Sequence, residues 1–493
     1  MFLTGWSTSF HNPSIKNSNP IVRNIAALVL REGCSKGTYV LLSILIARRY
    51  GKELLGQYAL ALLIPRLFFT VSDMGLNTLL TRNVAKSRQA LSLYMVNLTA
   101  LRALLGLLTL LLLIAFAYVV YPARPLFRLL CLSGLSYFVL NFITLINAAF
   151  RSFEKMTYEA RILISRDILF LLSALLWLAG RQSLGFLFFY FLICNTLALG
   201  YAVWLYRNFL GPPLASLDVA FCRKSLQGAR PIWLITLFSL LYLYVDSVLL
   251  SVFKGEAVVG LYNATFMFVE PFILAATILT TAFFPIFSRV SHNPTELRQT
   301  YTAVFKLAFF CGLPFQLGFL TLAGQWLRLF YGPSFLEATA AFRILMTGGV
   351  LFAIGSVNAH CLMACGDEAF VAKGMAAFLL LNLLLNLWWI PPLSFVGSSL
   401  ATVVCEGGVF LVFLLRIRSH AGIVPLRSFL GKLGMAGSAM AIACWMSQKL
   451  VFPASFGIGL VVYLLVDLLG RGYLWQERTT IASLWKELQT SSG

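Results

Sequence analysis

One stretch near the N-terminus decides the fold: residues 25–80, which read IAALVLREGCSKGTYVLLSILIARRYGKELLGQYALALLIPRLFFTVSDMGLNTLL. It consists of two apolar runs joined by a short basic turn, Arg48-Arg49-Tyr50-Gly51-Lys52. Each run is long enough to cross a bilayer, which takes about 20 apolar residues. Both runs also contain charged side chains, namely Arg31, Glu32, Lys36, Arg66 and Asp73. An ionisable group at the bilayer centre costs roughly 2.5–3.5 kcal/mol, so we predict that these five face a wet cavity lined by protein.

The composition is that of a membrane protein. Of the 493 residues, 59% are hydrophobic and 11% are charged, and the mean hydropathy is +0.85. A soluble chain carries roughly 25% charged residues, so this composition excludes a soluble globular protein. The net charge of +20 fits the enrichment of Lys and Arg in cytoplasmic loops. We predict no nucleic-acid partner, because no loop is long enough to carry a basic face with interleaved aromatic side chains.

The hydrophobic runs predict an all-α, multi-pass fold with about fourteen transmembrane helices. The candidate spans are residues 24–47, 54–80, 97–121, 126–150, 158–179, 183–206, 231–253, 258–285, 300–323, 335–362, 369–390, 394–415, 429–446 and 453–470. Lys and Arg in the short loops number roughly 23 on one side and nine on the other, which predicts that both termini are cytoplasmic. Such termini require an even number of spans, so twelve and fourteen both stay open.

A nine-residue motif occurs twice. Residues 51–59, GKELLGQYA, recur as residues 255–263, GEAVVGLYN, at an offset of 204. The positions that keep register are Gly51, Gly56 and Tyr58 in the first copy and Gly255, Gly260 and Tyr262 in the second. Both copies fall in outer turns six spans apart, so they have the same orientation across the membrane. This pattern predicts a parallel repeat, and transporters built from parallel repeats bind substrate between the halves; chance similarity of two glycine-bearing turns is the alternative.

The repeat divides the chain into two lobes. We predict two pseudo-symmetric six-helix bundles around a central cavity, followed by two C-terminal helices. The longest polar connection contains Gly211-Pro212-Pro213 and lies where a two-lobe protein needs its linker. The predicted parts are a cytoplasmic tail 1–23, an N-lobe 24–206, a cytoplasmic linker 207–230, a C-lobe 231–415, a helix pair 416–470 and a cytoplasmic tail 471–493.

These motifs resemble those of a known family. The glycine–tyrosine turn, the Ser72-Asp73-Met74-Gly75-Leu76 run, Asp246, and the Glu270-Pro271 pair with Pro285 are similar to the polysaccharide-exporter branch of the multidrug/oligosaccharidyl-lipid/polysaccharide (MOP) flippase superfamily. The resemblance covers nearly the whole chain. It implies two six-helix bundles that open alternately to the two sides of a bacterial inner membrane. It also implies a substrate, undecaprenyl-diphosphate-linked oligosaccharide destined for O-antigen or exopolysaccharide, and as partners membrane lipids, a polysaccharide polymerase and a co-polymerase.

The cations of the first two spans predict a phosphate site. At a rise of about 1.5 Å per residue, Arg31 and Asp73 share one depth, and Lys36 and Arg66 share another. We expect Arg31 to pair with Asp73, and Glu32 to pair with Lys36 one turn away. Arg66 then has no partner, and its planar guanidinium suits a diphosphate. The prediction is therefore that Arg66, helped by Arg31 and Lys36, binds the lipid diphosphate; the alternative is that these cations only hold the two spans together.

The second lobe contributes acids to the membrane interior. Asp246, Glu270 and Glu406 lie within predicted spans, and carboxylates at that depth can exchange a proton or bind Na⁺. We predict that Asp246 or Glu270 couples transport to an H⁺ or Na⁺ gradient. The alternative is neutralisation by a basic group such as Arg343. We expect Arg102 to extend to the lipid headgroups, and the neighbours Arg166 and Asp167 to point in different directions.

Other classes of function find less support in the sequence. The nine cysteines lie mostly in apolar runs, and they and the four histidines show no metal-binding spacing; we predict no metal site and no cofactor. A lipid II flippase and a multidrug/cation antiporter on the same fold are the nearest alternatives. A membrane-bound glycan polymerase or ligase is more remote, because each outer loop has about ten residues or fewer and lacks histidine. We therefore predict a transporter, not an enzyme, with neither a catalytic residue nor an ATP-binding loop.

Overall fold

The computed structural model describes residues 20–122, 125–180, 182–422, 427–448, 450, 452–470 and 473. The predicted tails, 1–23 and 471–493, lie largely outside this part of the chain. All regular elements of the described residues are helices, so the all-α prediction is confirmed. In chain order they are α1 (Pro20–Asp73), α2 (Leu76–Lys86), η2 (Arg88–Ala90), α3 (Leu91–Val120), α4 (Pro125–Ser152), α5 (Met156–Gly180), α6 (Leu184–Leu210), α7 (Val219–Lys254), α8 (Glu256–Phe266), α9 (Glu270–Val290), α10 (Pro294–Thr321), α11 (Ala323–Phe330), η3 (Pro333–Ala338), α12 (Thr339–Thr347), α13 (Gly349–Ala364), α14 (Glu368–Ala421), α15 (Arg427–Met446) and α16 (Phe452–Leu469).

Eleven helical segments among the described residues are long and apolar enough to cross a membrane. Two of them are double-length helices, α1 and α14, which leave helical geometry at Gly51 and Ser394. The shorter apolar helix α16 follows at the C-terminal end. If each long helix is taken as two spans and α16 as one, the helices are consistent with the fourteen predicted spans. The start of the seventh predicted span differs: α7 begins at Val219, inside the predicted linker, and its membrane-spanning part is Thr236–Lys254.

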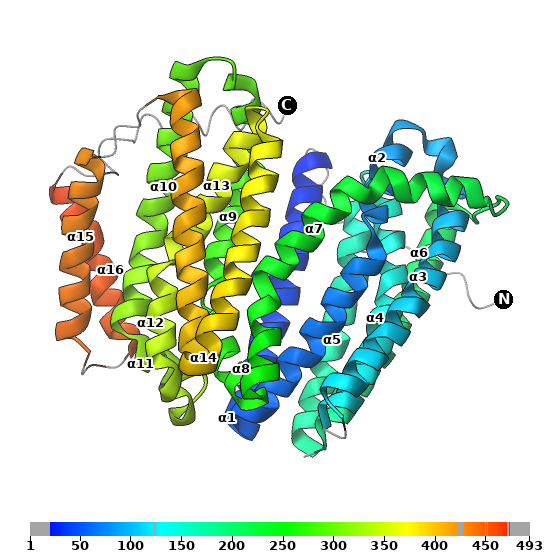
Figure 1. Ribbon diagram of the computed structural model, residues 1–493, viewed down its shortest axis with the longest axis horizontal. Helices are drawn as coiled ribbons and strands as arrows, with labels where there is room; N and C mark the ends of the chain where they lie inside the picture. The colour runs from blue at the N-terminus through cyan, green and yellow to red at the C-terminus, as the bar shows by residue number, and fades with distance from the viewer. Residues whose placement is uncertain are drawn as a thin grey trace, which may run out of the picture.

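The helices form two groups that meet at one end of the molecule (Figure 1). Helices α2–α6 lie in one group and α9–α16 in the other, with α1, α7 and α8 between them. The first half of α1 runs down to the turn at Gly51, and its second half returns along the first group. Helix α7 starts across α2 and α3 and then descends to the same end as Gly51. We call the end with Gly51 the outer end and the opposite end the inner end, after the predicted topology.

The two copies of the glycine motif have the same backbone conformation. Gly51 has φ 85° and ψ −172°, and Gly255 has φ 86° and ψ 178°. An L-residue with a side chain rarely adopts this positive φ, so glycine permits both turns. Tyr58 and Tyr262 are both buried: Tyr58 packs against Phe188 of α6, and Tyr262 donates a hydrogen bond to Asp246 of α7. The sequence repeat is therefore also a structural repeat at these turns.

The second glycines of the repeat touch each other's helices. A Cβ atom on Gly56 would lie 1.8 Å from the carbonyl oxygen of Glu256, and one on Gly260 would lie 1.9 Å from that of Lys52. These contacts are reciprocal, because Lys52 and Glu256 occupy the same place in the two copies. Only a hydrogen fits in the space where each Cβ would sit, so glycine lets α1 and α8 pack backbone to backbone. This contact joins the two helix groups at the outer end.

The buried apolar side chains are distributed differently at the two ends of the molecule. The largest core cluster contains residues of both groups, such as Phe188 of α6 and Phe305 of α10, together with Tyr58 of α1 and Tyr262 of α8. A second cluster packs α2–α6 and the start of α7 and includes Leu80, Leu98 and Phe150. A third packs α10 against α15 and α16. A core shared between the groups therefore forms at the outer end, whereas α2–α6 have a core of their own toward the inner end.

Candidate functional site

Arg66 lies between the two helix groups and is exposed. It follows Pro65 in the returning half of α1, where proline removes one backbone hydrogen bond. Its guanidinium donates to the hydroxyl of Tyr244 on α7 at 3.5 Å and lies 5.4 Å from the centroid of that ring. No acidic side chain forms an ion pair with Arg66 among the residues that the structure describes. Arg66 is thus an exposed cation at the interface of the groups, held by Tyr244 and without an acidic partner among the described side chains.

Lys36 and Glu270 join the groups across this interface. The amine of Lys36 on α1 lies 2.8 Å from a carboxylate oxygen of Glu270, and their side chains are 37% and 26% exposed. Glu270 begins α9, just after the break at 267–269 that separates α8 from α9. One turn further along α1, Tyr39 donates to Asn263 of α8 at 3.0 Å. The expected pairing of Lys36 with Glu32 is wrong, because the distant carboxylate of Glu270 takes the amine.

Arg31 lies in a different environment, inside the N-terminal group. Its guanidinium contacts Glu32 and donates to Glu159 of α5 at 2.7 Å, and Arg151 of α4 also binds Glu159. Glu159 is fully buried, whereas the side chain of Glu32 is 45% exposed. The predicted pair of Arg31 with Asp73 is therefore wrong. Two acids already neutralise Arg31, so of the three predicted phosphate ligands it is the least available.

Asp73 pairs instead with Arg102 of α3. The Arg102 side chain is fully buried and contacts Asp73, and it also donates to the carbonyl and side-chain oxygens of Asn141 at 2.6 and 2.7 Å. The expectation that Arg102 reaches the lipid headgroups is wrong. This ion pair sits immediately before Met74 and Gly75, whose positive φ angles end α1. Arg102 and Asp73 therefore fix the end of α1 against α3 and α4.

Arg166 and Asp167 also differ from the expectation that they diverge. Their side chains form an ion pair, and the hydroxyl of Ser35 on α1 contacts the same carboxylate. Ser35 adjoins Lys36, so this contact holds α1 against α5 on one face while Lys36 reaches the other group. Sequence reasoning missed this network and Glu159, because the partners lie on spans far apart in the chain.

Two of the three predicted coupling acids are buried in the C-terminal group. Asp246 of α7 accepts hydrogen bonds from the hydroxyl of Tyr262 and from the backbone of Ser247. Tyr262 also lies 3.4 Å from Thr402 of α14. Glu406 of α14 is buried beside Gly355 of α13. Neither acid has a cation as ion-pair partner among the side chains that the structure describes.

Arg343 does not neutralise the predicted coupling acids. It lies exposed on α12. Glu270 pairs with Lys36 instead, and the hydrogen bonds of Asp246 come from Tyr262 and Ser247. Among the described residues, Arg343 therefore forms no ion pair with these acids.

Polar contacts close the outer end around the glycine contact. Lys52 and Glu337 of η3 lie 2.7 Å apart, and Gln57 donates to Glu256 at 2.8 Å. Arg48 donates to the carbonyl of Phe330 at 2.9 Å. Each of these contacts joins α1 to an element of the C-terminal half. We call this set, with Gly56 and Gly260, the outer contact.

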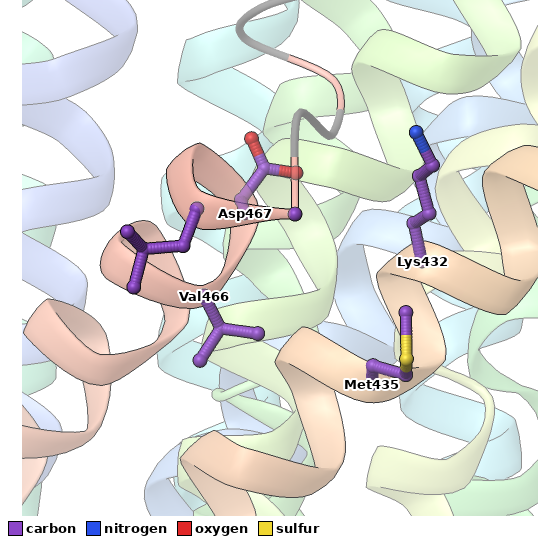
Figure 2. A pocket seen from close by; sticks show the side chains of 6 residues that line it. Lys432, Met435, Val466 and Asp467 are labelled. Carbon is purple, nitrogen blue, oxygen red and sulfur yellow. The ribbon is translucent and has the colours of Figure 1, made fainter.

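The remaining candidates lie away from the interface between the groups. A pocket of about 280 Å³ lies between α15 and α16, and Figure 2 shows Lys432, Met435, Val466 and Asp467 around it. None of the predicted site residues lines it. No cluster of three or more His, Cys, Asp or Glu side chains suited to a metal occurs among the described residues. The interface around Arg66, Lys36 and Glu270 therefore stays the main candidate site.

The fold is similar to those of solved transporter structures. The chain is similar to a solved structure of the lipid II flippase MurJ in an inward closed conformation, with a TM-score of 0.76, 14% identity, and coverage of 91% of this chain and 99% of that one. It is also similar to an inward-facing multidrug-resistance MATE family transporter of the MOP superfamily, with a TM-score of 0.64, 13% identity, and coverage of 81% and 98%. At these identities the similarity shows the fold, and the protein is a multi-pass membrane protein of that fold class.

Residues 21–291 match the family described as polysaccharide biosynthesis protein, and the chain belongs to this family. Among curated proteins it is similar to the probable flippase AglR of Haloferax volcanii, with 23% identity over 253 residues, 50% of this chain and 52% of AglR. It is 25% identical over 129 residues to the teichuronic acid biosynthesis protein TuaB of Bacillus subtilis, 26% of this chain and 27% of TuaB. The chain thus spans about half and about a quarter of these two relatives. The resemblance seen in the sequence is confirmed.

Proposed function

We propose that the protein is a flippase for undecaprenyl-diphosphate-linked oligosaccharides. It moves repeat units from the cytoplasmic to the outer leaflet of a bacterial inner membrane, for O-antigen or exopolysaccharide biosynthesis. Both termini are cytoplasmic in this proposal, and the protein transports its substrate without making or breaking a covalent bond. The observation that carries the proposal is the exposed guanidinium of Arg66 between the helix groups, without an acidic partner among the described side chains.

Arg66 captures the diphosphate in this proposal. A guanidinium holds phosphate oxygens through two parallel hydrogen bonds, and the charge strengthens both. Tyr244, which now accepts from Arg66 at 3.5 Å, keeps the side chain directed across the interface. Lys36 can supply a second positive charge when the diphosphate replaces Glu270 as its partner. Arg31 acts at most indirectly, because Glu32 and Glu159 already neutralise it.

The same residues favour an anionic substrate over a cationic one. Two cations of α1, Arg66 and Lys36, point toward the C-terminal group, and one acid, Glu270, faces them. A multidrug/cation antiporter needs an acidic and aromatic site with no excess of positive charge. The alternative substrate, lipid II, shares the diphosphate chemistry. Recognition of the glycan part therefore distinguishes the two substrates.

Ion coupling in this proposal belongs to Asp246 and Glu406. Both are buried and lack a cationic partner among the described side chains, whereas Glu270 is already paired with Lys36. Tyr262 connects Asp246 to the repeated turn, so a change of protonation or a bound Na⁺ at Asp246 reaches the outer contact directly. The driving force is an H⁺ or Na⁺ gradient, and no other cofactor is needed. A polysaccharide polymerase and co-polymerase receive the product.

Glycan export in cells tests the role of Arg66. A strain that lacks the gene is supplied with wild-type protein, Arg66→Ala, Arg66→Lys or Arg82→Ala at equal protein levels. We expect loss of export with Arg66→Ala and partial export with Arg66→Lys, because lysine keeps the charge but not the planar pair of donors. Arg82 is exposed on α2 and is the matched control. Full export in both Arg66 variants would refute the proposed role of Arg66.

Transport in vesicles tests the coupling. Collapse of the H⁺ and Na⁺ gradients with ionophores should stop uptake of lipid-linked glycan, and Asp246→Asn should reduce the response. Glu53→Gln, which changes an exposed acid of the outer turn, is the control. A transport rate that does not change when both gradients are collapsed would refute the coupling. It would not bear on diphosphate binding by Arg66.

A further inference from the structure

A groove outside the proposed transport site lies on the wall of the N-terminal group. It has a volume of about 410 Å³ and runs along α5 between α1 and α6. Its lining includes Leu30 of α1, Arg161, Ile164, Ser165 and Ile168 of α5, and Tyr201 of α6. One end is therefore polar and basic and the rest is mostly apolar.

The apolar part of the groove belongs to a surface that faces the acyl chains. Leu30 is 61% exposed and Ile168 is 51% exposed. Further along α5 the same helical face continues with exposed Leu172 and Leu176, at a spacing of four residues. In a membrane-spanning helix, such a row of exposed leucine and isoleucine contacts lipid. The groove thus opens toward the bilayer, where a lipid chain can enter it.

In the predicted topology, the basic end of the groove lies near the level of the headgroup phosphates. Arg161 comes five residues after the start of α5, roughly 8 Å along the helix axis. Its guanidinium lies 5.5 Å from the ring centroid of Tyr158. Lys155 lies outside the lining but close by: its amine is 5.8 Å from the ring centroid of Phe209, which packs 4.6 Å from that of Tyr158. Neither cation forms an ion pair with an acid in the described part of the chain. Aromatic rings hold both cations in place, and their charges stay available to an anion.

The groove and the exposed face that continues it are long enough for an acyl chain of one phospholipid leaflet. From Arg161 the lining on α5 continues to Ile168, roughly 10 Å at ~1.5 Å per residue, and the exposed Leu172 and Leu176 extend the same face to roughly 22 Å. One leaflet of hydrocarbon is about 15 Å thick, half of the ~30 Å core. An acyl chain fits this length, while two cations at the headgroup end favour a net negative headgroup over a zwitterionic one.

We propose that this groove is a binding site for an anionic phospholipid of the leaflet at the inner end. Arg161 and Lys155 hold its phosphate, and one acyl chain lies along Ile164, Ser165 and Ile168. The bound lipid braces α1 against α5 and α6 on a wall of the protein that the transported glycan does not need. The site is independent of which substrate the protein carries.

Native mass spectrometry of the full-length protein tests the site. The protein is extracted from vesicles of phosphatidylethanolamine with phosphatidylglycerol, phosphatidylcholine or undecaprenyl phosphate, and the retained lipid is counted. We expect retention of phosphatidylglycerol above phosphatidylcholine. Arg161→Gln should lower this retention about fivefold, as should Lys155→Gln, because each removes one cation near the headgroups. Arg161→Lys should retain the lipid.

A variant of unchanged charge tests the acyl part. Ser165→Trp fills the groove and should also lower retention of phosphatidylglycerol. Arg223→Gln removes an exposed cation of α7 outside the groove and should leave retention unchanged. The proposal is overturned if Arg223→Gln and Arg161→Gln act alike, if Ser165→Trp has no effect, or if phosphatidylcholine is retained equally. Retention of undecaprenyl phosphate in place of phosphatidylglycerol would overturn it too, and would assign the groove to the carrier lipid.

Discussion

At the residue scale, ion pairs neutralise several charges inside the N-terminal group. Arg31 meets Glu159, Arg166 meets Asp167, and Arg102 meets Asp73. These pairs satisfy groups that lipid would not accept, and each lies within one helix group. Arg66 and Lys36 differ, because both reach across to the other group. The distinction separates cations that pair within one helix group from the two that we propose as ligands of the diphosphate.

Arg102 gives the first prediction at this scale. Arg102→Ala removes a fully buried guanidinium and leaves Asp73 and Asn141 without their partner. Loss of one member of a buried ion pair costs about 3–5 kcal/mol, so the melting temperature of the purified protein should fall markedly. Arg82→Ala, at an exposed cation, should leave it unchanged. An equally small effect of both substitutions would show that the buried pair contributes nothing.

Asp367 gives a prediction about pH. It lies in the loop between α13 and α14, where hydrogen bonds from Arg416 and His420 lower its pKa to about 2. A lowered pKa in the folded state stabilises the fold above the unfolded pKa, near 4, and this stabilisation disappears as the pH falls toward 2. Asp367→Asn should therefore melt slightly below wild type from pH 7 to pH 4. A gap that stays constant down to pH 2 would contradict this assignment.

The sequence predicts which charges lie inside the membrane but not which of them pair. Depth along a helix follows from the rise per residue, so Arg66, Lys36 and Asp73 can be ranked from the chain alone. A pair also depends on how each helix is rotated about its axis, and that rotation is set by packing among distant spans. Lys36 and Glu270 are 234 residues apart. No local spacing indicates such a contact.

At the element scale, interruptions of helices position the site. Gly51 and Gly255 turn the chain at the outer end with the same positive φ. The break at 267–269 starts a new helix at Glu270, where the carboxylate meets Lys36. A helix start favours a negative charge, because its free N–H groups point along the axis. The repeated glycine motif thus determines where the chain turns, and the break at 267–269 places the carboxylate of Glu270 next to Lys36.

The prediction at this scale concerns Gly56, at the contact between α1 and α8. Gly56→Ala puts a methyl group against the backbone of Glu256, which cannot move aside as a flexible side chain could. We expect the outer contact to open, so that spin labels at Glu53 and Leu336, in a background without native cysteines, move apart in pulsed EPR. Gly33→Ala is the matched control on the same helix, since nothing lies within 4 Å of its Cβ position.

The outcome for Gly56 is decisive in either direction. Opening with Gly56→Ala and with Gly260→Ala, but not with Gly33→Ala, would confirm that the two glycines close the outer end together. Unchanged label distances in both repeat variants would show that α1 and α8 tolerate the methyl group.

Most elements could be predicted from hydrophobic runs, and the exceptions have physical reasons. Runs of about 20 apolar residues gave the spans, and glycine marked the turn at residue 51. The break at Ser394 follows Pro391 and Pro392 and lies at the predicted boundary between spans 369–390 and 394–415, but its positive φ of 55° on a residue that is not glycine has no signal in the sequence. Gly33 and Gly37 look alike in sequence to Gly56, yet only Gly56 touches another backbone. Residue type alone does not distinguish Gly56 from Gly33 and Gly37.

At the scale of the whole molecule, the two helix groups share a core at one end and diverge toward the other (Figure 1). The parallel repeat predicted two like-oriented halves, and the order of helices follows from it. The sequence could not predict which end is closed, because both arrangements bury the same spans. Polar contacts at the outer end, such as Lys52 with Glu337, add to the glycine contact in holding that end shut.

A reversible cross-link tests whether the outer end must open. Lys52→Cys with Glu337→Cys, in a background without native cysteines, should allow a short thiol cross-linker to join the groups. We expect transport in vesicles to stop after cross-linking and to return after cleavage of the linker. Unchanged transport in the cross-linked protein would contradict an alternating opening at this end.

The central claim is that Arg66 binds the diphosphate between the helix groups. The most direct measurement is the affinity of undecaprenyl diphosphate for the purified protein in nanodiscs, with wild type, Arg66→Ala, Arg66→Lys and the control Arg82→Ala side by side. Loss of a charge-assisted contact predicts an affinity about tenfold or more weaker in Arg66→Ala, an intermediate value in Arg66→Lys, and no change in Arg82→Ala. Equal affinity in wild type and Arg66→Ala would contradict the account.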